Sequence, residues 1–128
     1  MDNVLFESEY NQFICEEQYI IDAYYTINFK VKSGDFSGSG SFCIKDDEIK
    51  NIIYSLQQMQ QTLVGKRVIR DFDTDDFIQL SCEKLGHICV NGQLGGSHTE
   101  NFIRFKYMAD QTLLERLIVK LTYIVNKQ

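Results

Sequence analysis

Alternation of apolar and polar residues is the clearest pattern in the first third of the chain. From Tyr19 to Val31 every odd position carries an apolar side chain, while polar residues such as Asp22 and Lys30 stand at even positions. A period of two places successive side chains on opposite faces of a strand. The pattern therefore predicts one long strand over residues 19–31, with one buried face.

Residues 36–44 alternate in the same way and are expected to pair with this strand as a hairpin. A turn at Ser33–Gly34 would place Phe29 opposite Gly38. Large side chains then cover the glycines that face them across the hairpin. We therefore interpret the glycines of FSGSGSF as packing partners and not as a nucleotide-binding loop.

Two segments show the spacing of apolar positions that is typical of amphipathic helices. The first, residues 46–65, begins with acidic residues and ends at Gly65, as suits the two ends of a helix. The second covers residues 110–127, and Asp110 can cap its first turn. The apolar positions are Ile49, Ile52, Ile53, Leu56, Met59 and Leu63 in the first helix, and Leu113, Leu114, Leu117, Ile118, Leu121 and Val125 in the second.

Strands are also expected near residues 68–72, 77–83, 87–94 and 102–107. The turn in SCEKLGHICV tests their register, because a two-residue turn would set Ile88 opposite the polar Glu83. A three-residue turn at residues 84–86 pairs Cys82 with Ile88 and keeps the apolar residues on one face. We therefore expect the longer turn, with Gly86 in the left-handed conformation and Cys89 facing outward.

Strands followed by a helix, twice over, predict an α+β fold. We expect a single antiparallel, meander-like sheet with the two helices packed on its apolar face. Because the chain has no proline, linker or low-complexity stretch, residues 1–128 should form one domain. The other face of the sheet would carry Asn28, Gln79, Ser81, His87, Cys89, Asn91, Arg104 and Lys106.

The segment NGQLGGSHTEN, residues 91–101, is where a catalytic or phosphate-binding loop would be sought. It lacks the lysine of a Walker loop, the GxGxxG fingerprint and the last glycine of a nucleophile elbow. Ser97 and His98 are adjacent on extended chain, so their side chains point apart. The segment is predicted to be a turn between strands, and the chain is not expected to be an enzyme. Glu83 and His87, across the neighbouring hairpin, are the remaining acid–base alternative.

The charge of the chain narrows the class of partner. Eighteen acidic residues against thirteen basic ones give a net charge of −5, and the first basic residue is Lys30. This balance argues against nucleic-acid binding, which needs cations to displace counterions from phosphates. It suits a basic protein partner, although an acidic surface is also explained by solubility, with no partner involved.

The cysteines and the sequence at the start of the chain indicate the cellular compartment. Cys15, Cys43, Cys82 and Cys89 lack the close pairing of zinc ligands, so neither a metal nor another cofactor is expected. Unpaired thiols suit a reducing compartment. The chain has no apolar run long enough for a membrane helix and no signal-peptide layout at its start, so we expect a cytoplasmic protein away from the membrane.

The segment RDFDTDDF, residues 70–77, contains four aspartates. Asp71, Asp73 and Asp75 have the spacing of the first ligands of a calcium loop, but that loop requires glycine where Asp76 stands. The segment is interpreted either as a solvated acidic turn or as an acidic tip for a basic partner. Two aromatic residues on the polar face would be contact anchors. The candidate partner-binding residues are therefore Asp71, Asp73, Asp75, Asp76, Tyr24 and Phe102.

The last third of the chain, from LGHICVNG to LIVKL, resembles the ending of a family of small bacterial immunity proteins linked to wall-associated and contact-dependent toxins. The residues that carry this resemblance are Gly86, Ile88, Val90, Phe105, Asp110, Gln111 and Leu114. A weaker similarity covers SGSFCIKDDEIKNIIYSL. The resemblance implies a non-catalytic inhibitor that binds and blocks the C-terminal domain of a cognate toxin, often a basic nuclease.

Two other classes of function stay open beside this first hypothesis. A small-molecule-binding module would use the glycine-rich loop at residues 92–98, including His98, and would need an enclosed, mostly apolar pocket there. A homodimer would form through an exposed sheet edge. Neither alternative involves catalysis.

Overall fold

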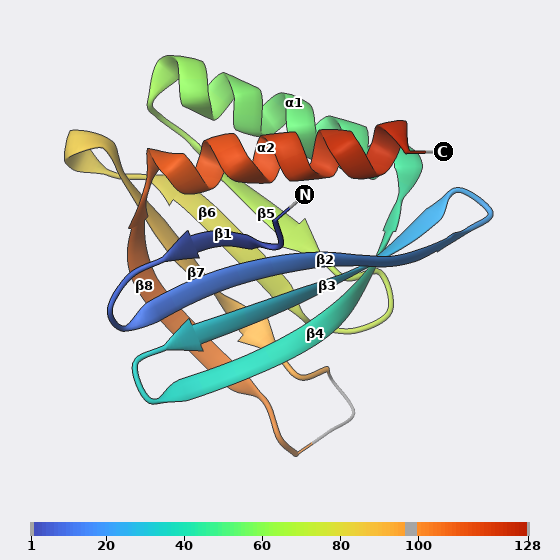
Figure 1. Ribbon diagram of the computed structural model, residues 1–128, viewed down its shortest axis with the longest axis horizontal. Coiled ribbons are helices and arrows are strands. Elements are labelled where there is room, and N and C mark those ends of the chain that lie inside the picture. Colours follow the sequence, from blue (N-terminus) through green and yellow to red (C-terminus); the bar gives the residue numbers. More distant parts are fainter. Residues whose placement is uncertain (1, 97–99, 128) are drawn as a thin grey trace.

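In the part of the chain that the structure, a computed structural model, describes (residues 2–96 and 100–127), two antiparallel sheets and two helices make up the fold (Figure 1). The first half of the chain contains β1 (Val4–Glu7), β2 (Asn11–Ile21), β3 (Tyr24–Ser33), β4 (Phe36–Lys45) and α1 (Asp46–Thr62). The second half contains β5 (Lys66–Arg70), β6 (Phe77–Cys82), a 3-10 turn (Lys84–Gly86), β7 (His87–Leu94), β8 (Ile103–Asp110) and α2 (Gln111–Asn126). Each sheet is thus a four-stranded meander followed by a helix.

The α+β class is as expected, but the prediction of a single sheet is wrong. Within the described residues, the strands form one ladder from β1 to β4 and a separate one from β5 to β8. Both sheets have an apolar face, and these faces cover each other, because two helices are too narrow to cover eight strands. The shared core includes Phe13, Phe29, Phe42, Leu56, Ile78, Leu80, Val90 and Leu114.

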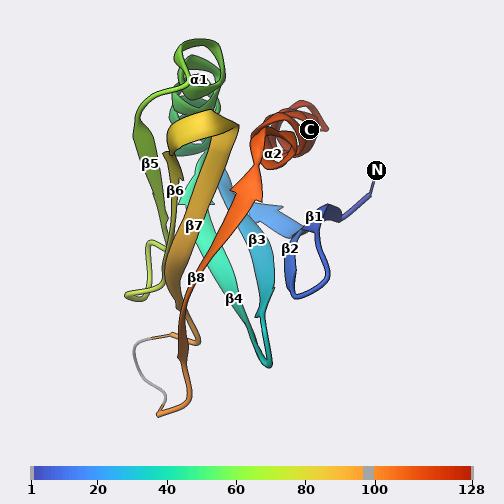
Figure 2. The same cartoon turned by 90° about the vertical axis from the view of Figure 1, so that its left-hand side faces the viewer.

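The helices lie side by side across one end of the two sheets instead of covering one face of a single sheet (Figure 2). α1 contacts β4 and β5, and α2 contacts strands of both sheets. As expected, Asp110 caps α2, with its Oδ1 accepting a hydrogen bond of 2.9 Å from the backbone nitrogen of Thr112. α1 ends differently from the prediction, because Leu63 takes the left-handed C-cap position and is exposed, two residues before Gly65. No helix of the described residues is long and apolar enough to cross a membrane.

The long strand predicted over residues 19–31 is in fact the end of one strand and most of the next. The chain reverses at Asp22–Ala23, where both residues have positive φ (48° and 67°), and Ile21 pairs with Tyr24. The turn places the odd-numbered residues before it and after it on opposite faces, and alternation concealed it because the outward-facing Tyr19 and Ile21 are themselves apolar.

The hairpin of β3 and β4 is confirmed, with a register two residues away from the predicted one. Gly34 (φ 63°) and Asp35 form the turn, so Phe29 pairs with Gly40. Gly40 also allows the loop before β6 to approach β4 closely, because a Cβ at this position would lie 2.7 Å from Asp76 Oδ2. The glycines of this strand are therefore packing positions, as expected.

The three-residue turn between β6 and β7 is confirmed, and Cys82 pairs with Ile88. Gly86 is left-handed (φ 78°), and so is Leu85, whose side chain is 95% exposed. The residues expected on one polar face are divided between two sheets, since Asn28 belongs to β3 and the others to β6, β7 and β8. Each of the four cysteines lies in the described residues and is a free thiol, but Cys89, which was expected to face outward, is only 3% exposed.

Candidate functional site

A β-bulge near the end of β2 turns two apolar side chains toward solvent. Glu17 pairs with Ile27 and Tyr19 with Thr26, so Gln18 is an extra residue without a partner on β3. One added residue exchanges the two faces of a strand. Tyr19 therefore shares the outer face with Thr26, where it is exposed, although the preceding residues of its odd-numbered series point into the core.

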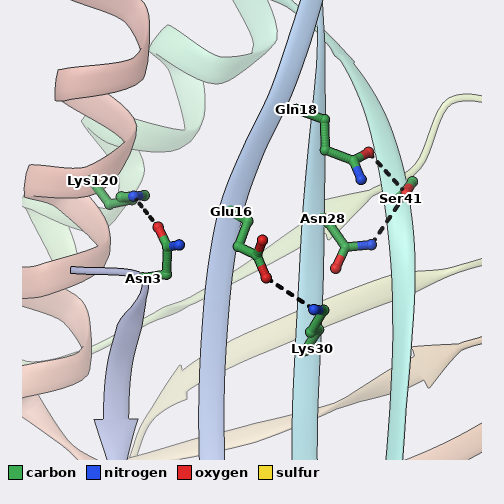
Figure 3. Close-up of polar contacts among 7 residues, drawn as sticks. All are labelled: Asn3, Glu16, Gln18, Asn28, Lys30, Ser41 and Lys120. Carbon is green, nitrogen blue, oxygen red and sulfur yellow. Dashed lines mark hydrogen bonds and ion pairs between the residues drawn. The ribbon is translucent and has the colours of Figure 1, made fainter. Parts of the chain in front are cut away.

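A chain of hydrogen bonds across three strands holds the bulge residue in place (Figure 3). Ser41 Oγ on β4 donates to Gln18 Oε1, and Asn28 Nδ2 on β3 donates to Ser41 Oγ, each over 3.1 Å. Beside them Lys30 Nζ pairs with Glu16 Oε1 at 3.0 Å. The Gln18 side chain is thereby held in place by residues of β3 and β4.

The β2–β3 turn projects beyond the first sheet beside the start of α1 (Figure 1). Its backbone is anchored, because the nitrogen of Asp46 donates a hydrogen bond of 2.8 Å to the carbonyl oxygen of Ala23. The hydroxyl of Tyr25 donates to Asp46 Oδ1 over 3.3 Å. Burial and the neighbouring Asp46 carboxylate raise the pKa of Tyr25, so this hydroxyl keeps its proton. The protruding end is thus attached to α1 at its base.

The four aspartates predicted as an acidic tip separate into two kinds. Asp71 and Asp76 are only 7% and 3% exposed, which contradicts a solvated turn at these positions. Asp76 accepts hydrogen bonds from the backbone nitrogens of Gly95 (3.1 Å) and Gly96 (2.8 Å). Asp71 Oδ1 accepts from Cys43 N and Oδ2 from Thr74 Oγ1. Both carboxylates therefore maintain the loop, whereas Asp73 and Asp75 are exposed on its outside.

Phe72 extends from this loop toward β3. It is 73% exposed, and its ring meets that of Tyr24 edge to face, with the centroids 5.9 Å apart. The nitrogen of Phe72 donates a hydrogen bond of 3.1 Å to the carbonyl of Cys43. Loop and strand are thus joined by backbone and side chain at one point.

Tyr24 stands between two grooves. The first, called the Tyr24 groove below, has a volume of about 520 Å³. It is lined by Tyr19, Ile21, Asp22, Tyr24, Thr26, Ser41, Cys43 and Asp73. Burial raises the pKa of the Cys43 thiol, and the negative charges of Asp73 and Asp71 raise it further, as is consistent with carboxylates close to the groove floor. The groove therefore combines aromatic and aliphatic walls with acidic residues.

The neighbouring groove, about 540 Å³ in volume, carries charges of both signs. Arg67 forms an ion pair with Glu48 and donates to Ser55 Oγ over 3.1 Å. The guanidinium of Arg70 lies 6.0 Å from the ring centre of Phe77. These cations are engaged within the protein, so this groove presents a largely neutralised surface.

The structure brings together only part of the predicted set. Tyr24 and Asp73 line the same groove, whereas Phe102 lies near the start of β8 in a separate shallow groove that includes Gly95 and Ser39. Sequence reasoning missed Tyr19, Ile21, Asp22 and Phe72. The available signal was the break in alternation at Ile20 and Tyr24, where apolar side chains occupy positions that the pattern reserves for polar ones.

The glycine-rich loop offers little to a small ligand in its described part. The groove beside it measures about 370 Å³ and is open to solvent along Ser37, Gly38 and Ser39. Ser97 and His98 lie outside the described residues. Glu83 and His87 are both exposed and are linked by a backbone hydrogen bond of 2.8 Å. No cluster of metal-ligating side chains is present in the described residues.

The chain is similar to a known protein family over almost its whole length. The model of the immunity protein WapI-like family matches residues 6–128. The similarity is therefore not restricted to the last third of the chain, where the sequence resemblance was recognised. Comparison with curated proteins and with solved structures gave no match.

Proposed function

Because the chain belongs to the WapI-like family of immunity proteins, we propose that it protects its own cell by binding the C-terminal domain of a cognate toxin and blocking that domain. The family implies toxin immunity and a protein partner. Binding, with no reaction, is the proposed mechanism. The proposed place of action is the cytoplasm, since four unpaired cysteines suit a reducing compartment.

The observation that carries this proposal beyond the family is the concentration of exposed apolar side chains at one end of the first sheet. Tyr19, Ile20, Ile21 and Phe72 are all exposed there, around the half-buried Tyr24. Exposed apolar groups grouped in this way, with a polar rim, are typical of protein-binding surfaces. Aromatic side chains in such surfaces supply much of the binding energy.

The charge of the protein suits a basic toxin. At a net charge of −5, encounter with a positively charged domain is accelerated by attraction over several ångströms, and salt weakens this acceleration. Charge would thus act mainly on the association rate, while the apolar contacts slow dissociation.

The first test is co-expression with the C-terminal region of the protein encoded immediately upstream in the same genome. We expect rescue of growth and co-purification as a stoichiometric complex. A lack of both rescue and complex formation would refute the proposal for this pair of proteins.

A titration separates inhibition by binding from enzymatic inactivation. An inhibitor that occludes its target reaches full effect near one equivalent per toxin domain. Complete inactivation by a small fraction of an equivalent would instead require turnover and would contradict the non-catalytic mechanism. The same samples, analysed by light scattering, report whether one or two copies of the chain enter the complex.

A further inference from the structure

We propose that the Tyr24 groove receives an arginine or lysine side chain of the toxin, with Asp22 and Asp73 as its carboxylate partners. This inference rests on the proposed function and assigns it to one surface. The occupant is a cationic side chain presented by a folded protein domain.

The chemistry of the groove selects a cation. Among the described residues that line it, none is basic, and two are aspartates. Tyr19 and Tyr24 contribute aromatic rings, whose faces attract cations, and Ile21 supplies an apolar wall for the aliphatic stem of lysine or arginine. A cation held between carboxylates and rings gains charge-assisted hydrogen bonds as well.

The β2–β3 turn that borders this groove lowers the stability of the folded protein. A non-glycine residue in the left-handed region costs about 1 kcal/mol, and Asp22 and Ala23 both adopt that conformation. Ile20 and Ile21 beside them remain exposed to water. Such costs are typical of segments that are shaped by a partner.

The walls are also fixed before any partner arrives. The Ala23 carbonyl is bonded to Asp46 N at 2.8 Å on one side, and the loop that carries Asp73 is held by Asp71 on the other. Asp71 Oδ1 accepts from Asp73 N as well, over 3.2 Å. A preformed groove loses little conformational freedom on binding, which favours affinity.

The neighbouring groove is a weaker choice for the same occupant. Its arginines, Arg67 and Arg70, offset the charge of its carboxylates, and Glu48 is already paired with Arg67, so this groove offers little net negative charge to a cation. The acidic character of the surface is therefore greatest on the Tyr19 side of Tyr24.

The experiment measures binding of the purified C-terminal region of the upstream-encoded protein to variants of this chain at several salt concentrations. The test variant is the double substitution Asp22→Asn/Asp73→Asn. A second variant, Phe72→Ala, removes the ring that packs on Tyr24 from the side of the neighbouring groove. Asparagine tolerates the left-handed backbone at position 22, so the turn is preserved. We expect the double variant to bind at least about tenfold more weakly and with a flatter dependence on salt.

Matched controls exist at the opposite end of the first sheet. Asp35 lies in the β3–β4 turn, and Phe36 is 70% exposed, close to the value for Phe72. Asp35→Asn and Phe36→Ala should leave affinity within about twofold of the unsubstituted chain. Alkylation of Cys43, which lines the groove, should slow in the complex, whereas Cys82 on the other sheet should be unaffected.

The outcomes separate the two proposals. If the unsubstituted chain neither binds nor rescues, the proposed function fails and this inference with it. If it binds while the double aspartate variant retains full affinity, or if the controls weaken binding equally, only the groove assignment is overturned. Weakening by Phe72→Ala without any effect of the two aspartates would also overturn it, because the occupant would then be apolar.

Discussion

Asp71 Oδ1 lies 2.9 Å from the backbone nitrogen of Cys43 and accepts its hydrogen bond, which attaches the loop after β5 to the edge of the other sheet. The same oxygen accepts from Asp73 N, and the second carboxylate oxygen accepts from Thr74 Oγ1 over 2.6 Å. One buried side chain thereby determines both the shape of the loop and its position against β4. The loop presents Phe72 to Tyr24 as a result.

Replacing Asp71 by alanine should lower the free energy of unfolding by about 2 kcal/mol, because two partly buried backbone N–H groups, those of Cys43 and Asp73, would lose their acceptor. Asp73→Ala is the control, since that side chain is exposed and should change stability by less than about 0.5 kcal/mol. Urea denaturation of both variants measures the difference. Equal stability of the two would show that the Asp71 contacts contribute nothing.

Ala23→Gly should stabilise the protein, in contrast to most glycine substitutions. Ala23 has φ 67°, a conformation that glycine adopts without steric cost, so a gain of up to about 1 kcal/mol is expected. Ala109→Gly, at a buried position in β8, should have the opposite sign. Thermal unfolding of the two variants provides the comparison, and destabilisation by Ala23→Gly would contradict the turn geometry.

Stability should fall at alkaline pH, partly through Tyr107. Burial raises the pKa of this phenol above its ordinary value of 10.0, so the native state keeps a proton that the unfolded chain releases. The free energy of unfolding is therefore unaffected by this group below pH 10 and decreases above it, by up to about 1.4 kcal/mol per pH unit. Urea midpoints from neutral pH to about pH 11 measure the slope.

The variant Tyr107→Phe isolates this contribution. It should flatten the decline above pH 10, at the cost of about 1 kcal/mol at neutral pH from the lost 2.9 Å hydrogen bond to the Gln12 carbonyl. Tyr123→Phe, on the exposed side of α2, should leave the slope unchanged. A slope that Tyr107→Phe does not alter would assign the decline to other groups.

The thiols should differ in reactivity according to their surroundings. Cys15 is fully buried, and burial raises its pKa to about 12, although the nearby Lys120 ammonium lowers it in part. Iodoacetamide at neutral pH should leave Cys15 unmodified in the native protein and modify it in urea. Cys43 and Cys82, which are partly exposed, should react first. Peptide mapping by mass spectrometry distinguishes the sites.

Sequence patterns were sufficient where neighbours along the chain determine the structure. The cap at Asp110 bonds to a residue two positions away, and the turn at Gly86 is local, so both could be predicted. The division into two sheets depends on where β4 and β5 lie relative to each other, which no local pattern encodes. The pairing of Phe29 with Gly40 was missed for a smaller reason, a turn displaced by one residue.

The candidate site was only half predictable, for related reasons. Tyr24 and Asp73 were recognisable as an aromatic and an acid at polar positions, and both line the groove. The burial of Asp71 follows from its contact with Cys43, 28 positions earlier in the chain, and cannot be read from the acidic run itself. The outward orientation of Tyr19 was concealed because the unpaired Gln18 shifts the odd–even series of β2 by one residue.

That unpaired residue has an evolutionary consequence. Deleting Gln18 would restore the regular ladder of β2, with Glu17 opposite Ile27 followed directly by Tyr19 opposite Thr26, so Tyr19 and Ile21 would stay on the outer face. A single codon lost or gained at this position would thus be absorbed at the bulge, with the core of the fold and the aromatic wall both retained. Related chains could therefore differ in length within this strand, and diverge in the toxins they recognise through substitutions on its surface.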